Sequence, residues 1–366
     1  MRYQYAISFF RDDGSALAQI PVTPDWGPAL EWLQFEGMRA GLLPAVTAAA
    51  RGTVEPVWHP QIGQPCIAGV RAVASARDRT LSREIPRSYF RALASQAAND
   101  LVHKGVLTQG EVFRYSVNAY PAPQPPAREG TAVDFAVEEV LAPLPLEEAP
   151  LESFFSGAVP AGSAAVDGDV PVFISEPVLD ELTRLARQAG DCETGGVLVG
   201  TLRRDSSVPE IFVEIAAQIA ATHTESSSTK LTFTAETWAA VRAAIALRKR
   251  SELMIGWWHY HPDFCRLKNC PVERRRTCTL SSAFFSAEDV HLHRTCFPRA
   301  YQVAVLISDS TAEGLTQAMY GWRQGMVAER GMYVVERQSR VDSQKMNHQE
   351  EKEKQDVDFR PSTFDH

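Results

Sequence analysis

The sequence lacks the features that mark membrane, nucleic-acid-binding and disulfide-rich proteins. None of its apolar runs approaches the ~20 residues that cross a bilayer, so we expect no membrane partner. The net charge is −8, and a nucleic-acid partner would require a basic face, so we expect none. Six cysteines in 366 residues are too few for a disulfide framework.

The first residues, "MRYQYAISFFRDDGS", have no apolar core of a secretory signal, because charge returns at positions 11–13. We therefore expect a cytoplasmic protein. In that reducing compartment cysteine thiols stay free for metal binding or catalysis.

What the sequence does have is the composition of a globular protein, with 45% hydrophobic and 22% charged residues. Its length allows two domains, each with its own core. The abundance of alanine and arginine, with few lysines and asparagines, is typical of a bacterial protein.

The first expected unit, residues 1–120, has the alternation and helical spacing of a small α/β domain, whose role the sequence does not indicate. Residues 121–169 are rich in proline and alanine and predict a linker. Leu151, Phe154 and Phe155 are more apolar than a spacer requires, so part of this linker could dock on a neighbouring domain. The expected elements of the first unit are strands at 3–10 and 111–120 and helices at 27–41 and 85–105.

A second ordered region is expected over residues 170–337, followed by a polar, charge-rich tail at 338–366 that predicts disorder. Helices and strands are expected to alternate along it. The expected strands are 170–175, 193–202, 210–220, 252–262, 301–308, 317–324 and 331–337, and the expected helices are 176–190, 235–250 and one that begins at Ser286.

Two histidines stand one residue apart in "GWWHYHP", at the end of an apolar strand. Residues i and i+2 of a strand share a face, so His259 and His261 can reach one ion. A catalytic zinc site usually has three protein ligands, and Asp289 of "SAED" is the best third ligand. The plainer alternatives are two strand-end histidines without a metal and an ordinary capped helix start at Ser286.

A hydrolytic zinc site also needs a general base close to the reacting water. Glu193 suits this role, because it precedes the strand "TGGVLVG", whose two glycines allow close backbone approach. The alternative is a polar residue in an ordinary helix-to-strand turn.

Together, Glu193 before "TGGVLVG", then "HYHP", then "FFSAED" resemble the motifs of the JAB/MPN (JAMM) zinc metallopeptidase family. The resemblance covers residues 170–337 and points to a deubiquitinase-like bacterial member. It implies an α/β (α+β) fold, with a JAB/MPN-type mixed β-sheet flanked by helices after the smaller N-terminal α/β domain.

The resemblance also implies roles for individual residues. His259, His261 and Asp289 would bind one catalytic zinc ion. Glu193 would activate the water and pass its proton to the leaving amine, and Ser286 would help to stabilise the oxyanion.

In the family such a site cleaves after the C-terminal glycine of a ubiquitin-like protein, which it removes from conjugates or matures from a precursor. The implied partners are therefore a ubiquitin-like protein, its conjugates and E1- or E2-like ligation proteins. Two alternatives stay open: a peptidase acting on a sulfur-carrier protein or small amino-acid adducts, and a non-catalytic MPN scaffold that binds partner proteins.

The sequence departs from the family pattern between His261 and Ser286, where residues 262–285 form an insert. Cys265, Cys270 and Cys278 lie inside it, and three thiolates with one more ligand would suit a second, structural zinc. Free cysteines in an irregular loop, or a reactive thiol beside the catalytic zinc, are the alternatives. The candidates for the fourth ligand are Cys296, then His293 or His291.

Overall fold

The computed structural model describes residues 2–45, 52–76, 79–123, 143–221, 224–227, 230–248, 250–278, 284–310 and 313–336. The apolar segment 131–141 inside the expected linker and the expected disordered tail at 338–366 lie outside these residues. In the described part of the chain, no helix is both long enough and apolar enough to span a bilayer.

The N-terminal domain contains two three-stranded sheets, with orders β2-β1-β6 and β3-β4-β5. An isolated bridge between Cys66 and Asn118 links the two sheets. Its elements are β1 (Tyr3–Arg11), β2 (Ala16–Val22), α1 (Gly27–Arg39), β3 (Thr53–Trp58), β4 (Ile67–Ala76), β5 (Arg79–Pro86), the 3-10 helix η1 (Arg87–Phe90), α2 (Arg91–His103) and β6 (Phe113–Pro121). The helix expected from residue 85 therefore starts later, because residues 85 and 86 extend β5.

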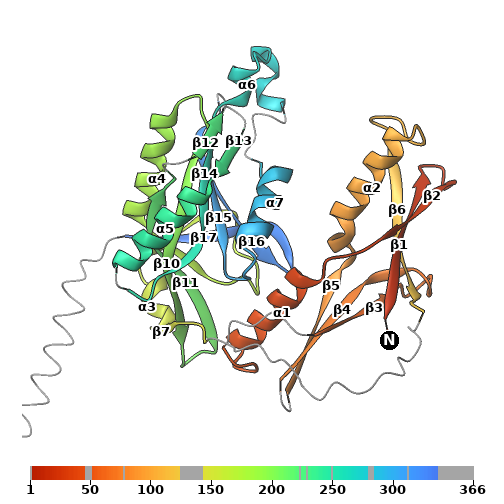
Figure 1. Cartoon of the computed structure of the whole chain (residues 1–366), viewed down its shortest axis with the longest axis horizontal. Helices are drawn as coiled ribbons and strands as arrows, with labels where there is room; N and C mark the ends of the chain where they lie inside the picture. The colour runs from red at the N-terminus through yellow and green to blue at the C-terminus, as the bar shows by residue number, and fades with distance from the viewer. Residues whose placement is uncertain are drawn as a thin grey trace, which may run out of the picture.

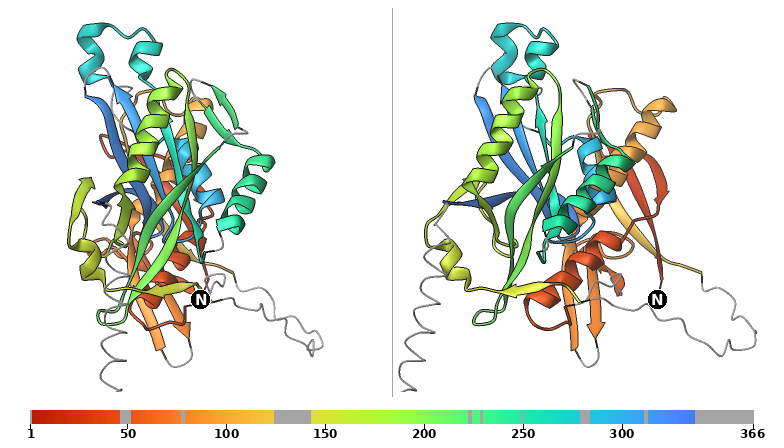
Figure 2. Two further views of the ribbon diagram at one scale, coloured as in Figure 1. Left: turned by 90° about the vertical axis from the view of Figure 1, so that its left-hand side faces the viewer. Right: turned by 60° about the vertical axis from the view of Figure 1, so that its left-hand side comes forward.

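The second domain is built on a nine-stranded mixed sheet with helices around it (Figures 1 and 2). Its elements are β7 (Leu146–Glu148), α3 (Leu151–Phe155), β8 (Ala158–Gly162), β9 (Val172–Ser175), α4 (Glu176–Ala189), β10 (Thr194–Asp205), β11 (Glu210–Ala220), β12 (Thr224–Ser227), β13 (Lys230–Phe233), α5 (Ala235–Arg248), β14 (Leu253–His261), α6 (Phe264–Leu267), the 3-10 helix η2 (Val272–Thr277), α7 (Ala287–Cys296), β15 (Val303–Ser310), β16 (Gly314–Arg323) and β17 (Met326–Val335). This mixed sheet with flanking helices, preceded by a separate α/β domain, confirms the predicted fold class.

The strand order of the large sheet is β11-β9-β17-β16-β15-β14-β10-β7, with β8 paired to β17. Because β11 also pairs with β10, the path of strands closes on itself. The two faces carry different helices. Leu198 of β10 packs in the same cluster as Leu182 of α4, whereas Val197 packs with Val241 of α5, as strand alternation requires.

Residues expected in the linker add structure to the second domain. Strand β7 pairs in parallel with β10, and β8 pairs antiparallel with β17. The rings of Phe154 and Phe155 on α3 lie 5.2 and 5.1 Å from that of Phe173 on β9. The part of the predicted linker after residue 143 therefore belongs to the sheet of the second domain.

Helix α1 joins the two domains, because it contributes to both of their cores. Ala29 and Leu33 are buried with the N-terminal strands. Phe35 and Met38 are buried with the large sheet, and the rings of Phe35 and Tyr301 lie 5.7 Å apart. In Figure 1 the helix lies between the large sheet and the strands of the N-terminal domain.

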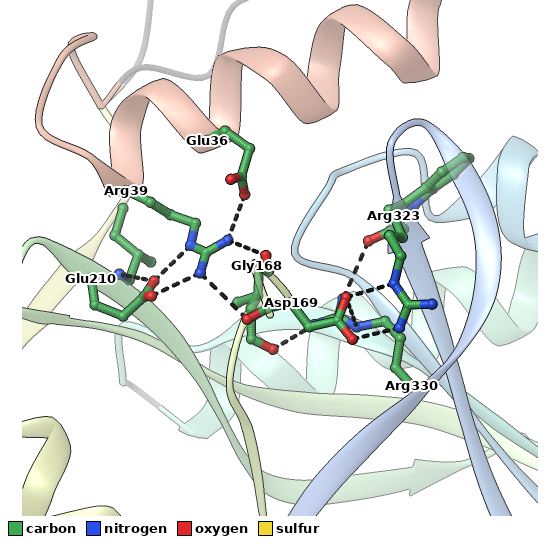
Figure 3. A network of polar contacts seen from close by, with 10 residues as sticks. Glu36, Arg39, Gly168, Asp169, Glu210, Arg323 and Arg330 are labelled. Carbon is green, nitrogen blue, oxygen red and sulfur yellow. Dashed lines mark hydrogen bonds and ion pairs between the residues drawn. The ribbon is translucent and has the colours of Figure 1, made fainter. Parts of the chain in front are cut away.

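A network of buried and partly buried charges reinforces this interface (Figure 3). Arg39, at the end of α1, donates from Nε and Nη2 to the carboxylate of Glu210 at 2.6 and 2.7 Å, and from Nη1 to the carbonyl of Gly168 at 2.8 Å. The next residue, Asp169, accepts from Nε and Nη2 of Arg323 at 2.8 and 2.6 Å. Its carboxylate also lies 3.8 Å from Nε of Arg330, so one short segment connects charges from three elements.

Candidate metal centre

The two histidines lie at the end of β14, just before the chain leaves the sheet. His259 pairs with Gly195 of β10 on one side and with Leu306 of β15 on the other. The alternation of the strand places His259 and His261 on one face. They are 1% and 5% exposed.

The register of β10 brings Glu193 to the same place. Thr194 pairs with Tyr260, so Glu193, one residue earlier, lies beside His261 and on the same face of the sheet. Strand β10 can approach its neighbouring strands closely here because position 196 is a glycine. A Cβ on Gly196 would lie 2.4 Å from the carbonyl oxygen of Ile219 and 2.7 Å from Nε1 of Trp258.

Asp289 is held by the cap of α7. The Ser286 hydroxyl accepts from the Asp289 N–H at 3.1 Å, and the Ser286 N–H donates to Oδ2 of Asp289 at 2.7 Å. This reciprocal capping box fixes the first turn of the helix. It therefore holds the carboxylate in place, and the structural and ligand interpretations of "SAED" describe the same geometry.

The three side chains converge despite the insert between them. The Nε2 atoms of His259 and His261 are 3.0 Å apart, and the Asp289 oxygens lie 3.4 and 3.6 Å from them. Ligand atoms around a tetrahedral zinc with bonds of about 2.0–2.1 Å are about 3.3 Å apart. Two arrangements explain the short distance between the Nε2 atoms: a hydrogen bond from one imidazole to the other, or two lone pairs directed at a shared cation. The adjacent Asp289 carboxylate favours the cation.

Aromatic rings enclose the two imidazoles. The ring of Trp257 stacks on His259 at 4.4 Å, and Phe285 lies 5.7 Å from His259. Phe264 and Phe284 lie 5.3 and 5.4 Å from His261. Because these rings exclude water, charges at the site interact more strongly than they would at the surface.

The protonation states of the site suit metal binding, which needs neutral histidine and ionised carboxylate. Burial, together with the neighbouring His259, lowers the pKa of His261 to about 3. Burial alone would raise the pKa of Asp289, but its contacts with both histidines and with the Ser286 N–H lower it overall. Burial and the negative charge of Asp289 raise the pKa of Glu193 to about 7, which is typical of a general acid or base.

His293, four residues after Asp289 on α7, contacts the metal site indirectly, through Trp257. Its Nδ1 accepts a hydrogen bond from Nε1 of Trp257 at 3.1 Å, and Trp257 stacks on His259. His293 is wholly buried, and burial and the nearby Arg330 charge lower its pKa to about 3. It therefore remains a neutral acceptor at physiological pH.

We expect His293 to make folding stability fall in acid. Below its ordinary pKa of about 6.5 the imidazole takes up a proton only in the unfolded chain, so the free energy of unfolding should drop by up to about 1.4 kcal/mol per pH unit until the folded pKa near 3 is reached. Urea unfolding of the wild type and of His293→Asn between pH 5 and 7 measures this difference. Asparagine keeps an acceptor for Trp257 but does not titrate, and equal pH slopes in the two proteins would contradict the assignment.

The cysteines of the insert divide into two groups. The sulfur atoms of Cys265, Cys270 and Cys278 lie within 4.8 Å of one another. Cys296, expected as the fourth ligand, does not join them and lies exposed at the end of α7. His293 and His291 do not join them either, and His293 is occupied by Trp257. The structure therefore brings three of the four predicted cysteines together and leaves the candidates on α7 outside the group.

Sequence reasoning missed the residues that enclose and support the metal ligands. Phe264 lies in an irregular segment without a pattern, and Phe284 and Phe285 were quoted only as part of "FFSAED", with no role assigned. His293 was named only as a candidate ligand of the insert, yet its position has a usable signal for this role, because i and i+4 of a helix share a face and Asp289 was already a candidate. Ser308 of β15 pairs in register with His261 of β14. Its hydroxyl is buried with no hydrogen-bond partner among the described residues, and nothing in its sequence context indicates this position.

Comparison with known proteins matches part of the second domain to a family model. The family model described as JAB1/Mov34/MPN/PAD-1 ubiquitin protease matches residues 170–278. This span includes Glu193 and both histidines and ends inside the insert, before Ser286 and Asp289. No curated protein matches the chain.

Among solved structures, the chain resembles the solution structure of protein DSY2949 from Desulfitobacterium hafniense. The identity is 21% and the TM-score is 0.32, over 46% of this chain and 96% of that chain. At this level the likeness carries no argument about function. The match to the family model does, and it shows a JAB/MPN domain at residues 170–278, of a family that contains both metallopeptidases and non-catalytic members.

Proposed function

We propose that the second domain is a zinc-dependent peptidase or isopeptidase that cleaves after the C-terminal glycine of a ubiquitin-like protein, in conjugates or in a precursor. The observation that carries the proposal is the convergence of His259, His261 and Asp289 at metal-ligand spacing beside a buried carboxyl group, Glu193, poised near neutrality. A non-catalytic scaffold has no need for such a carboxyl group.

His259, His261 and Asp289 would hold the zinc ion. Zinc bound there would supply a Lewis acid for the scissile carbonyl and lower the pKa of a water molecule. The three residues form a preorganised site: the histidines are held on one strand face, and the carboxylate is held by the capping box at the start of α7.

Glu193 would move the proton. Its register beside His261 places it at the edge of the ligand set, and its buried position keeps its pKa near 7. At that pKa one carboxyl group can accept a proton from the attacking water and then donate it to the leaving amine. A surface glutamate, with an ordinary pKa of about 4.3, would release the proton to the amine less readily.

The Ser286 hydroxyl could donate a hydrogen bond to the oxyanion. Its oxygen accepts from the Asp289 N–H, and a hydroxyl that accepts one hydrogen bond still has its own O–H to donate. A donor aimed at the developing negative charge stabilises the transition state.

The aromatic enclosure supports a glycine at the cleavage point. Phe264, Phe284 and Phe285 crowd the histidines, so a substrate chain must approach with little side-chain bulk. The glycine tail of a ubiquitin-like protein meets this requirement, and the matched family model bears the description of a ubiquitin protease. Under this proposal E1- and E2-like ligation proteins make the conjugates that the enzyme cleaves.

The test is a ubiquitin-like protein fused through its C-terminal glycine to a reporter. We expect the full-length, zinc-loaded protein to cleave after that glycine, as intact mass shows, and to lose activity with a chelator and regain it with added zinc. A matched fusion with valine in place of the glycine should resist cleavage. Zinc binding without cleavage of any glycine-ended fusion would favour the scaffold instead, and cleavage that survives chelation would contradict the zinc mechanism.

A further inference from the structure

The insert between β14 and α7 is organised around three cysteine side chains. Cys265 lies on α6 and is fully buried, whereas Cys270 and Cys278 are partly exposed. Their sulfur atoms lie within 4.8 Å of one another. In Figure 1 α6 lies beyond the end of β14, at the top of the second domain.

The backbone is shaped to bring the first two sulfurs together. The Asp263 side chain caps α6 by accepting from the Arg266 N–H at 2.9 Å. Asn269 then adopts a left-handed φ of 52°, which a non-glycine residue adopts at some cost and asparagine tolerates best. The reversal ends with the Cys270 N–H donating to the Cys265 carbonyl at 2.9 Å.

Apolar packing does not account for the order of this segment. No described side chain between positions 266 and 275 is buried, and Val272 is 71% exposed. A segment of this kind is usually ordered by something other than a core. The three cysteines bring the two ends of this segment together, because their sulfur atoms lie close to one another.

The charge of the segment also suits three thiolates. Besides the cysteines, the segment between positions 262 and 278 has five basic and two acidic residues, namely Arg266, Lys268, the arginines at 274–276, Asp263 and Glu273. Cysteine binds metal as the thiolate. Three thiolates around a divalent cation leave one negative charge, which this basic excess offsets.

We propose that Cys265, Cys270 and Cys278 bind a second zinc ion that clips the insert together. Thiolate ligands select a soft cation such as zinc. In the described part of the chain no fourth histidine, cysteine or carboxylate joins the group, so a solvent molecule completes the coordination on the exposed side. A disulfide is a poorer explanation, because it would use two of the three thiols.

The clip would also shape the wall of the candidate active site. Phe264 precedes Cys265, and its ring lies 5.3 Å from that of His261. Holding Cys265 therefore holds this ring against a catalytic ligand. The second metal ion and the catalytic one have separate ligands, so each can be removed without the other.

The test counts zinc by elemental analysis in the full-length protein after metal removal and reloading. We expect two ions per chain in the wild type, one in Cys270→Ser and in Cys278→Ser, and one in His259→Ala. Cys192→Ser and Cys296→Ser are matched controls that should keep both ions. Cys270→His, which retains a ligand atom, should recover the second ion and separates loss of a ligand from misfolding.

Cobalt substitution gives a second measurement that does not depend on activity. Sulfur-to-cobalt charge transfer in the near ultraviolet should appear in the wild type and in His259→Ala, and should disappear in Cys270→Ser. One ion per chain that only His259→Ala removes would overturn the proposal. So would an intact mass two hydrogens lighter in the metal-free native protein together with failure to take up a second ion, because both results would show a disulfide instead.

Discussion

Glu193→Gln should lower kcat/KM for cleavage of the glycine-ended fusion by about 10²–10⁴-fold, the usual contribution of a general acid–base group. Glutamine has the same shape but cannot accept the proton of the attacking water or return it to the amine. The metal ligands are untouched, so zinc content should stay at the wild-type level. Steady-state cleavage kinetics and elemental analysis on the same samples check both parts.

Glu176→Gln is the matched control, because Glu176 is an exposed carboxylate at the start of α4. This variant should cleave the fusion at the wild-type rate. Full activity of zinc-loaded Glu193→Gln would show that another group moves the proton. Loss of zinc in that variant would show instead that Glu193 holds the metal site together.

Asp169→Ala should reduce the free energy of unfolding by about 3–5 kcal/mol, the usual cost of leaving a buried charge without its partner. Arg330 is fully buried, and burial lowers its pKa only to about 10, so it stays charged at neutral pH. Asp169 is its counter-ion and also accepts two hydrogen bonds from Arg323. Urea unfolding followed by circular dichroism measures the loss.

Asp167→Ala tests whether the effect belongs to this carboxylate, because Asp167 is exposed in the same segment. A surface substitution of this kind changes stability by less than about 0.5 kcal/mol. If Asp169→Ala lost no more than Asp167→Ala, the network in Figure 3 would contribute little to stability.

Much of the candidate site could be predicted because local rules determine it. A strand alternates its side chains, so His259 and His261 had to share a face wherever the strand packed. A serine followed three residues later by an acidic residue begins a helix, so Asp289 had to lie in its first turn. These rules depend on neighbours in sequence and need no knowledge of the fold.

The linker shows how little composition says about strand pairing. Proline and alanine predicted a linker at 121–169 of which a part could dock, and in the structure β7 and β8 pair with β10 and β17. Strand pairing is made by backbone N–H and C=O groups, which every residue except proline offers in full. Whether a segment pairs therefore depends on an open sheet edge nearby, and composition does not report that edge.

The fourth cysteine shows the same limit at a smaller scale. Cys296 follows the other cysteines closely in sequence, but α7 ends near Trp257 and Phe297 in an aromatic cluster and carries Cys296 away from the insert. The same helix brings Asp289 to the histidines across the insert.

The sequence by itself therefore determined which side chains share a strand face or a helix turn, because those relations are set by backbone periodicity. Only the tertiary structure decided which of these faces meet: Glu193 beside His261, Asp289 across the insert, three cysteines together without the fourth, and α1 between two cores. The reason is physical, since such meetings depend on strand register and on the packing of distant apolar surfaces.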